Sequence, residues 1–256
     1  GYYWFQGLPG TGETLLLYDM AMKLSVRQQV CLIHCGEAVE QWKVLHERLR
    51  RVKYLADSQI TSDLLSGASA VLVDEAHLLS QEKLEYLLRY CGKRPVIFSS
   101  DYENMLSPEE LDRAAVHALE QISGIQSFRL TNRIRTNAEI SSFIQNMMCL
   151  PERKKGRHFP HVTVLYANDD READVLLSDA QHQGYQVILN EAEPAICAGR
   201  LAMVLDQRYF YDRQNYLRSD DRSVRRLFHQ LNGAKEELLL VVKQNEPLYA
   251  ALLDLL

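Results

Sequence analysis

Residues 7–14 read Gly-Leu-Pro-Gly-Thr-Gly-Glu-Thr and form a short turn-rich segment between an apolar run and a helical pattern. Such a loop turns successive backbone N–H groups towards an anion, and the positive end of the following helix adds to the attraction. Its glycines allow a close approach and positive φ angles that side chains would prevent. The segment therefore predicts a site for phosphate groups, in which the Thr14 hydroxyl reaches a magnesium ion. The predicted binding residues are Gly7, Pro9, Gly10, Thr11, Gly12, Glu13 and Thr14.

The spacing matches the P-loop pattern at every position except one, because Glu13 stands where that pattern requires lysine. The lysine ordinarily meets the β- and γ-phosphates as a compact positive charge. At about 4 Å and an effective dielectric near 20, one pair of unit charges is worth roughly 4 kcal/mol. Reversing the sign adds a repulsion of similar size, unless Glu13 turns to solvent or binds a proton. Lys23 lies about 15 Å further along the helix and cannot replace the missing charge. We therefore expect ATP and Mg²⁺ to bind only weakly.

Residues 70–77, Ala-Val-Leu-Val-Asp-Glu-Ala-His, have the form of a Walker B strand. In this motif the apolar residues bury the strand, the aspartate holds magnesium through water, and the glutamate orients the attacking water. An exposed acidic strand end would account for Asp-Glu alone, but the glycine loop earlier in the chain favours the nucleotide interpretation. We expect Thr14 and Asp74 to hold the metal, and Asp74 and Glu75 to act in catalysis.

Short β-rich runs alternate with amphipathic helical patterns along the chain, which is typical of parallel sheets covered by helices. We therefore expect an α/β fold with two lobes, over residues 1–125 and 126–256. The predicted strands span residues 2–5, 30–34, 70–73, 95–99, 127–130, 162–166, 185–189, 201–205 and 238–242. The predicted helical segments span residues 13–24, 39–49, 140–148, 171–181, 222–231 and 248–256, the helix at 140–148 being capped by Thr136.

The composition, with 46% hydrophobic and 25% charged residues, is that of a packed protein. No apolar run approaches the roughly 18 residues of a membrane span, and the five scattered cysteines predict a reducing, cytoplasmic setting. The segment 31–35, Cys-Leu-Ile-His-Cys, matches no zinc spacing and predicts core thiols. The net charge of −5 gives no general attraction to nucleic acid. Binding would depend on basic clusters at 48–53, 153–157 and 222–226, which solvated helix faces also explain.

With these motifs placed, the chain resembles the helicase-type P-loop domains of superfamily 1, and more closely the schlafen-type DNA/RNA helicase-like ATPases of bacteria. The resemblance covers nearly the whole chain and implies a P-loop NTPase fold with two RecA-like lobes. Residues 95–101 are similar to the family's third motif, with Asn104 in place of its glutamine sensor. Residues 130–137 resemble the motif that opens the second lobe, which implies that Arg135 faces the phosphates in catalysis. Relatives of this kind bind single-stranded nucleic acid between the two lobes.

At two places the sequence lacks residues that the family uses to hydrolyse ATP. Residues 195–199, Ala-Ile-Cys-Ala-Gly, keep none of the fifth motif's defining side chains, and Gly233 stands where the final motif offers an arginine finger. Losing one arginine finger typically costs about 10³–10⁵ in rate. We therefore expect a helicase-like nucleotide-binding domain that is a degenerate, or pseudo-, ATPase with impaired hydrolysis, acting inside a larger protein or complex. Replacing Glu13 by lysine and Gly233 by arginine is expected to restore binding before turnover.

Two other functions stay open on the sequence. A partner subunit could donate the missing arginine and complete an active ATPase or DNA/RNA helicase-type motor. Alternatively, the chain is a non-catalytic protein or nucleic-acid interaction module whose cleft is empty or is plugged by Glu13. Turnover stimulated by a partner would reveal the first, and the absence of any heat on titration with Mg·ATP would favour the second.

Overall fold

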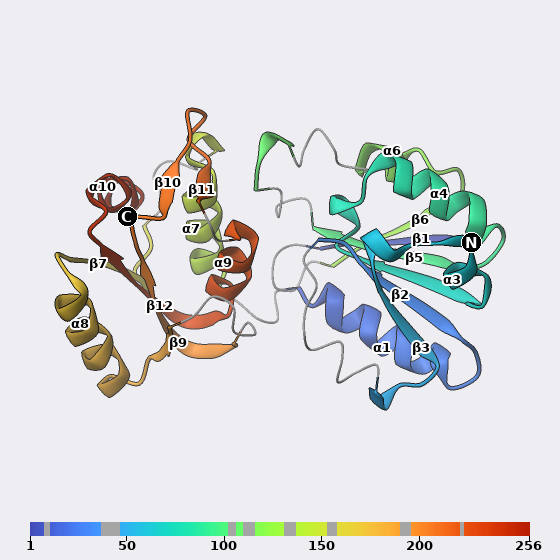
Figure 1. The fold of residues 1–256 in the computed structure, drawn as a ribbon, viewed down its shortest axis with the longest axis horizontal. Helices are drawn as coiled ribbons and strands as arrows, with labels where there is room; N and C mark the ends of the chain where they lie inside the picture. Colours follow the sequence, from blue (N-terminus) through green and yellow to red (C-terminus); the bar gives the residue numbers. More distant parts are fainter. Residues whose placement is uncertain are drawn as a thin grey trace. The chain divides into compact units, whose positions relative to one another are not determined.

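The computed structural model (Figure 1) describes residues 1–7, 11–36, 47–101, 106–109, 116–130, 137–152, 158–189, 196–220 and 223–256. Contacts within the chain divide it into two compact units, Gly1–Asn132 and Arg133–Leu256. Each unit is built around its own parallel sheet.

The sheet of the first unit has six described strands in the order β3-β2-β4-β5-β1-β6, all paired in parallel. They are β1 (Tyr2–Gly7), β2 (Val30–His34), β3 (Val52–Ala56), β4 (Ala70–Asp74), β5 (Val96–Asp101) and β6 (Gln126–Arg129). Only β5 separates β1, which leads into the glycine loop, from β4, which ends at Asp74. Because the strands are parallel, their carboxyl ends meet at one edge of the sheet, where sheets of this kind bind ligands.

Helices cover both faces of this sheet (Figure 1). The helix α1 (Glu13–Ser25) lies on one face, and α3 (Ser62–Ser66), α4 (Gln81–Cys91) and α6 (Val116–Glu120) lie on the other. Leu32 of β2 packs in the cluster under α1, whereas its neighbour Ile33 packs in the cluster under α4, because successive strand residues face opposite sides. This double burial explains why the strands read as continuous apolar runs in the sequence.

The second unit has a parallel sheet in the order β7-β12-β9-β8. Its strands are β7 (Val162–Ala167), β8 (Gln186–Ile188), β9 (Ala198–Leu205) and β12 (Ala234–Lys243), and a separate hairpin pairs β10 (Tyr209–Tyr211) with β11 (Leu217–Ser219). The helix α8 (Asp170–His182) packs on one face of the sheet through Ala173 and Leu177. The helices α7 (Ala138–Met148), α9 (Val224–Leu231) and α10 (Glu246–Leu253) lie on the other face (Figure 1).

The predicted α/β fold with parallel sheets flanked by helices is confirmed. The boundary between the units differs from the expectation, because β6 pairs with β1 and so residues 126–132 belong with the first unit. The helix α7 is capped by Asn137, whose side chain accepts a hydrogen bond from the Glu139 N–H, rather than by Thr136. Most of the helix predicted over residues 39–49 lies outside the described residues.

No helix in the described part of the chain combines the length and the apolarity needed to span a membrane.

Candidate functional site

The glycine loop joins the end of β1 to the start of α1, as its sequence predicts. Gly12 caps α1 with φ +87°, in the left-handed region that glycine adopts without strain, and its carbonyl accepts the Leu16 N–H at 2.9 Å. The N-terminus of α1 therefore lies at the carboxyl edge of the sheet. Pro9 and Gly10 lie outside the described residues.

Asp74, at the end of β4, is held by contacts with three side chains. Its Oδ1 accepts hydrogen bonds from the Thr14 hydroxyl at 3.3 Å and from the Ser99 hydroxyl at 2.8 Å. Its Oδ2 lies 3.3 Å from Nδ1 of His34. Burial raises the pKa of Asp74. The hydrogen bond and charge of His34, together with the hydrogen bonds from Ser99 and Thr14, outweigh burial and hold the pKa of Asp74 below 3.8. The group is therefore ionised at neutral pH.

The residues at this point fit a magnesium ion, because a hydroxyl and an ionised carboxylate are oxygen ligands of the kind that Mg²⁺ takes. Thr14 comes from α1 and Asp74 from β4, 60 residues apart in sequence, and they meet through one hydrogen bond. The sequence had predicted this pair as the metal site.

The lowered pKa of Asp74 predicts that the first unit becomes less stable at acidic pH. A depressed carboxyl pKa contributes stability above the unfolded value near 3.8 and loses it as the pH falls through the folded pKa. We expect the free energy of unfolding to fall below about pH 4, and the Asp74→Asn variant to lack part of this fall. Urea titrations followed by tryptophan fluorescence measure it, since Trp4 is buried in the first unit. An Asp63→Asn variant, changed at an exposed position, should keep the wild-type profile, and an unchanged loss of stability at acidic pH in Asp74→Asn would contradict the prediction.

Glu75 follows Asp74 in a left-handed backbone conformation, with φ +54°, which is uncommon for a residue with a side chain. Its Oε2 lies 3.3 Å from Nε2 of His77, whose side chain is fully buried. Backbone strain of this kind costs roughly 1–3 kcal/mol and persists where surrounding contacts fix it. The predicted catalytic glutamate therefore sits beside Asp74 at the same edge of the sheet, in contact with a buried imidazole.

Glu13 stays at the loop instead of turning out to solvent. The Thr11 hydroxyl donates a hydrogen bond to Glu13 Oε1 at 3.1 Å, and Thr11 itself is buried. A Cβ built on Gly7 would lie only 2.0 Å from Glu13 Oε1, so the carboxylate rests directly against the backbone at the end of β1. A negative oxygen thus lies against Gly7, at the start of the segment whose sequence predicts an anion site.

The structure brings seven of the predicted site residues to one edge of the first sheet: Gly7, Thr11, Gly12, Glu13, Thr14, Asp74 and Glu75. Arg135 and Asn104, like Pro9 and Gly10, lie outside the described residues. Two residues at the Asp74 carboxylate were missed, His34 and Ser99. A signal for both existed, because each lies near the carboxyl end of a predicted parallel strand and such ends share an edge.

Gly233 lies where the backbone leaves no room for a side chain. A Cβ at this position would lie 2.0 Å from the carbonyl oxygen of Ile196 and 3.0 Å from that of Gln230. Both obstacles are backbone atoms, so no rotamer change relieves them. The expectation that arginine can be restored at position 233 is therefore wrong, because any side chain there must displace the backbone.

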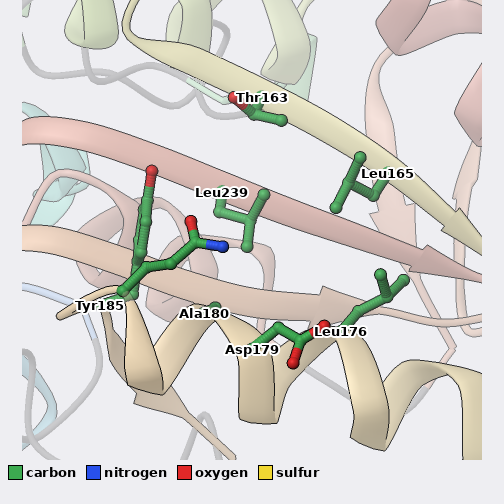
Figure 2. Close-up of a pocket in the computed structure, with 8 residues that line it drawn as sticks. Thr163, Leu165, Leu176, Asp179, Ala180, Tyr185 and Leu239 are labelled. Atoms are coloured by element: carbon green, nitrogen blue, oxygen red, sulfur yellow. The ribbon is translucent and has the colours of Figure 1, made fainter.

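The second unit has a cavity of about 210 Å³ under α8 (Figure 2). Leu165, Leu176 and Leu239 line its apolar part. On its rim, the Tyr185 hydroxyl donates to Glu237 Oε2 at 2.5 Å; burial, followed by this bond and the Glu237 charge, raises the pKa of Tyr185 to about 12. None of the sequence-predicted site residues lines this cavity.

No protein-family model and no curated protein matches the sequence. Similar solved structures include the Pif1 helicase from Bacteroides in complex with ADP-AlF3 and ssDNA, at 15% identity and a TM-score of 0.39, covering 72% of this chain and 53% of that chain. Bacteroides Pif1 bound to ssDNA gives 13% identity and a TM-score of 0.38, over 70% of this chain and 52% of that chain. The chain spans about half the length of these helicases.

Because these TM-scores are low, the fold of the chain is assigned from its own topology. A parallel strand leads through a glycine-rich turn into a helix, and the threonine of that helix bonds an aspartate that ends a nearby strand. The first unit therefore has the strand order and strand–loop–helix topology of a P-loop fold.

Proposed function

We propose that the chain is a helicase-like P-loop nucleotide-binding domain that has lost efficient hydrolysis, a degenerate ATPase that acts within a larger protein or complex. The observation that carries this proposal is the position of Glu13. Its carboxylate lies against Gly7 and accepts the Thr11 hydroxyl at the loop where a triphosphate would bind.

Glu13 opposes a bound phosphate because both groups are negatively charged. A phosphate oxygen that approached the loop would meet the Glu13 carboxylate in place of a lysine ammonium. Loss of the attraction and addition of the repulsion together approach roughly 8 kcal/mol at an effective dielectric near 20, before screening and rotamer escape reduce the figure. Even a quarter of that sum weakens binding by about thirtyfold.

The remaining residues support weak binding rather than none. Thr14 and Asp74 would hold Mg²⁺, which would neutralise part of the phosphate charge, and Asp74 is already held ionised by its hydrogen bonds. Glu75 would orient a water molecule beside them. Arg135 would face the phosphates, as the resemblance implies. Without a lysine or an arginine finger, these groups leave hydrolysis near background.

Phosphate release from radiolabelled ATP tests the loss of hydrolysis. We expect the wild-type chain and its Glu75→Gln variant to release phosphate at the same low rate, because no competent reaction depends on Glu75. The glutamine keeps the size of the side chain beside His77, so the comparison isolates the carboxylate. If the wild type turned over ATP at a rate that Glu75→Gln abolishes, the chain would be an active ATPase and the proposal would fail.

An exposed basic segment favours nucleic acid as a second partner of the first unit. Arg48, Arg50 and Lys53 are exposed, whereas the Arg51 guanidinium is held by the Val26 carbonyl. We expect single-stranded DNA or RNA to bind with an affinity that falls steeply with salt, and Arg48→Glu/Arg50→Glu to weaken it at least tenfold. Filter binding over a salt series measures both. Arg89→Glu, which reverses the charge of an exposed residue on α4, is the control. An affinity that does not change with salt concentration would contradict nucleic-acid binding.

A further inference from the structure

His34 places an imidazole nitrogen beside the carboxylate that ends β4. The Cα atoms of His34 and Asp74 are partners in the parallel register of β2 and β4. Nδ1 of His34 lies 3.3 Å from Asp74 Oδ2, and the two side chains are 13% and 3% exposed. The carboxylate is also fixed in orientation, because Ser99 donates to its other oxygen. Two potential metal ligands from neighbouring strands therefore converge at a partly accessible point.

The separation of these two atoms suits a shared cation. Nitrogen and oxygen ligands bind first-row dications at about 2.0–2.2 Å. Two ligands at about 2.1 Å, at an angle between roughly 90° and 110°, are about 3.0–3.4 Å apart, a range that includes the observed 3.3 Å. The Thr14 hydroxyl, bonded to the opposite oxygen of Asp74, lies on the same side as the glycine loop. A bound cation would replace the proton that lies between His34 Nδ1 and Asp74 Oδ2, which leaves a neutral imidazole with its hydrogen on Nε2.

We infer that His34 and Asp74 form a binding site for a first-row transition-metal dication such as Co²⁺, which it takes in preference to Mg²⁺. Imidazole suits these metals, whereas Mg²⁺ takes oxygen ligands almost exclusively. The proposed site has two strong protein ligands, fewer than the three or more that were sought and not found among His, Cys, Asp and Glu side chains of the described residues. Water and phosphate oxygens would complete the coordination. The inference deepens the proposed nucleotide site and rests on it for a biological role.

The test uses the full chain and metal alone, without nucleotide. Calorimetric titrations with Co²⁺ and with Mg²⁺, together with the visible absorption of bound Co²⁺, are compared between variants. The wild type should bind one Co²⁺ at least tenfold more tightly than Mg²⁺. His34→Gln keeps an N–H donor for Asp74 but lacks the imidazole, so it should lose at least tenfold in Co²⁺ affinity and change Mg²⁺ affinity less than threefold.

His117→Gln is the matched control, because His117 forms another pair with a carboxylate, Glu120, at 3.7 Å on an exposed helix surface. It should bind Co²⁺ as the wild type does. Equal wild-type affinities for the two metals, no Co²⁺ binding, or equal losses in His34→Gln and His117→Gln would each overturn the inference. Even if a variant fails to fold, equal wild-type affinities or the absence of Co²⁺ binding still overturns the inference. The degenerate-ATPase proposal is tested separately by ATP turnover, so the two can fail independently.

Discussion

Replacing Glu13 by lysine is expected to raise the affinity for Mg·ATP by about a hundredfold, which corresponds to roughly 2.7 kcal/mol. The substitution removes the carboxylate that lies against Gly7 and adds the ammonium that phosphates require. The expected gain is about a third of the roughly 8 kcal/mol in the unscreened charge sum. Calorimetric titration of the variant with Mg·ATP measures it.

The same substitution should destabilise the nucleotide-free chain. Glu13 is the acidic residue in the first turn of α1, where a negative charge interacts favourably with the helix N-terminus by about 0.3–1 kcal/mol. Lysine reverses that interaction, so the unfolding temperature without nucleotide should fall by a few degrees while the affinity rises. Glu82→Lys is the matched control, because Glu82 is an exposed acid in the first turn of α4. A gain in Mg·ATP affinity in Glu82→Lys equal to that in Glu13→Lys would show that net charge, rather than this position, controls binding.

Replacing Gly233 by alanine is expected to destabilise the second unit by about 3 kcal/mol, the upper end of overpacking costs. The new Cβ would meet the Ile196 carbonyl at 2.0 Å. The backbone cannot yield freely, because the Gly233 N–H donates to Gln230 and its carbonyl accepts the Ala198 N–H, both at 3.0 Å. Urea unfolding followed by circular dichroism measures the loss.

Gly199→Ala provides the comparison within the same unit. A Cβ at Gly199 would lie 3.2 Å from a carboxylate oxygen of Glu236, and that side chain end can move. We expect this variant to lose less than about 1 kcal/mol. If Gly233→Ala were as stable as Gly199→Ala, the glycine would have no packing role, and arginine at position 233 would again be admissible.

The sequence predicted the sheet strands of the first unit best where both faces are buried. The strand β2 was predicted over the residues that form it, 30–34, because its apolar run has no solvent-facing positions. The edge strand β3 was missed, because Lys53 and Tyr54 interrupt its apolar pattern. The helix α4 was missed as well, although Ser80 caps it. The hairpin of β10 and β11 pairs only three residues on each side, too few to show a periodic pattern.

The candidate site was predictable in its residue types and only partly in its contacts. Glycine, threonine and aspartate at fixed spacings predicted a site formed by the loop and the end of β4, and a hydrogen bond joins two of those residues, Thr14 and Asp74. His34 lies at the carboxyl end of a predicted strand, which is a signal for the shared edge, but only the strand order makes it the neighbour of Asp74. The sequence alone also could not distinguish a lost arginine from a required glycine at position 233. Only the approach of the Ile196 carbonyl separates them.

The measurement that tests the account most directly is a calorimetric titration of the purified wild-type chain with Mg·ATP. The carboxylate at the phosphate loop predicts a dissociation constant of about 0.1 mM or weaker. A dissociation constant in the low micromolar range, with Glu13 intact, would contradict the account, since it would require another positive group to reach the terminal phosphate.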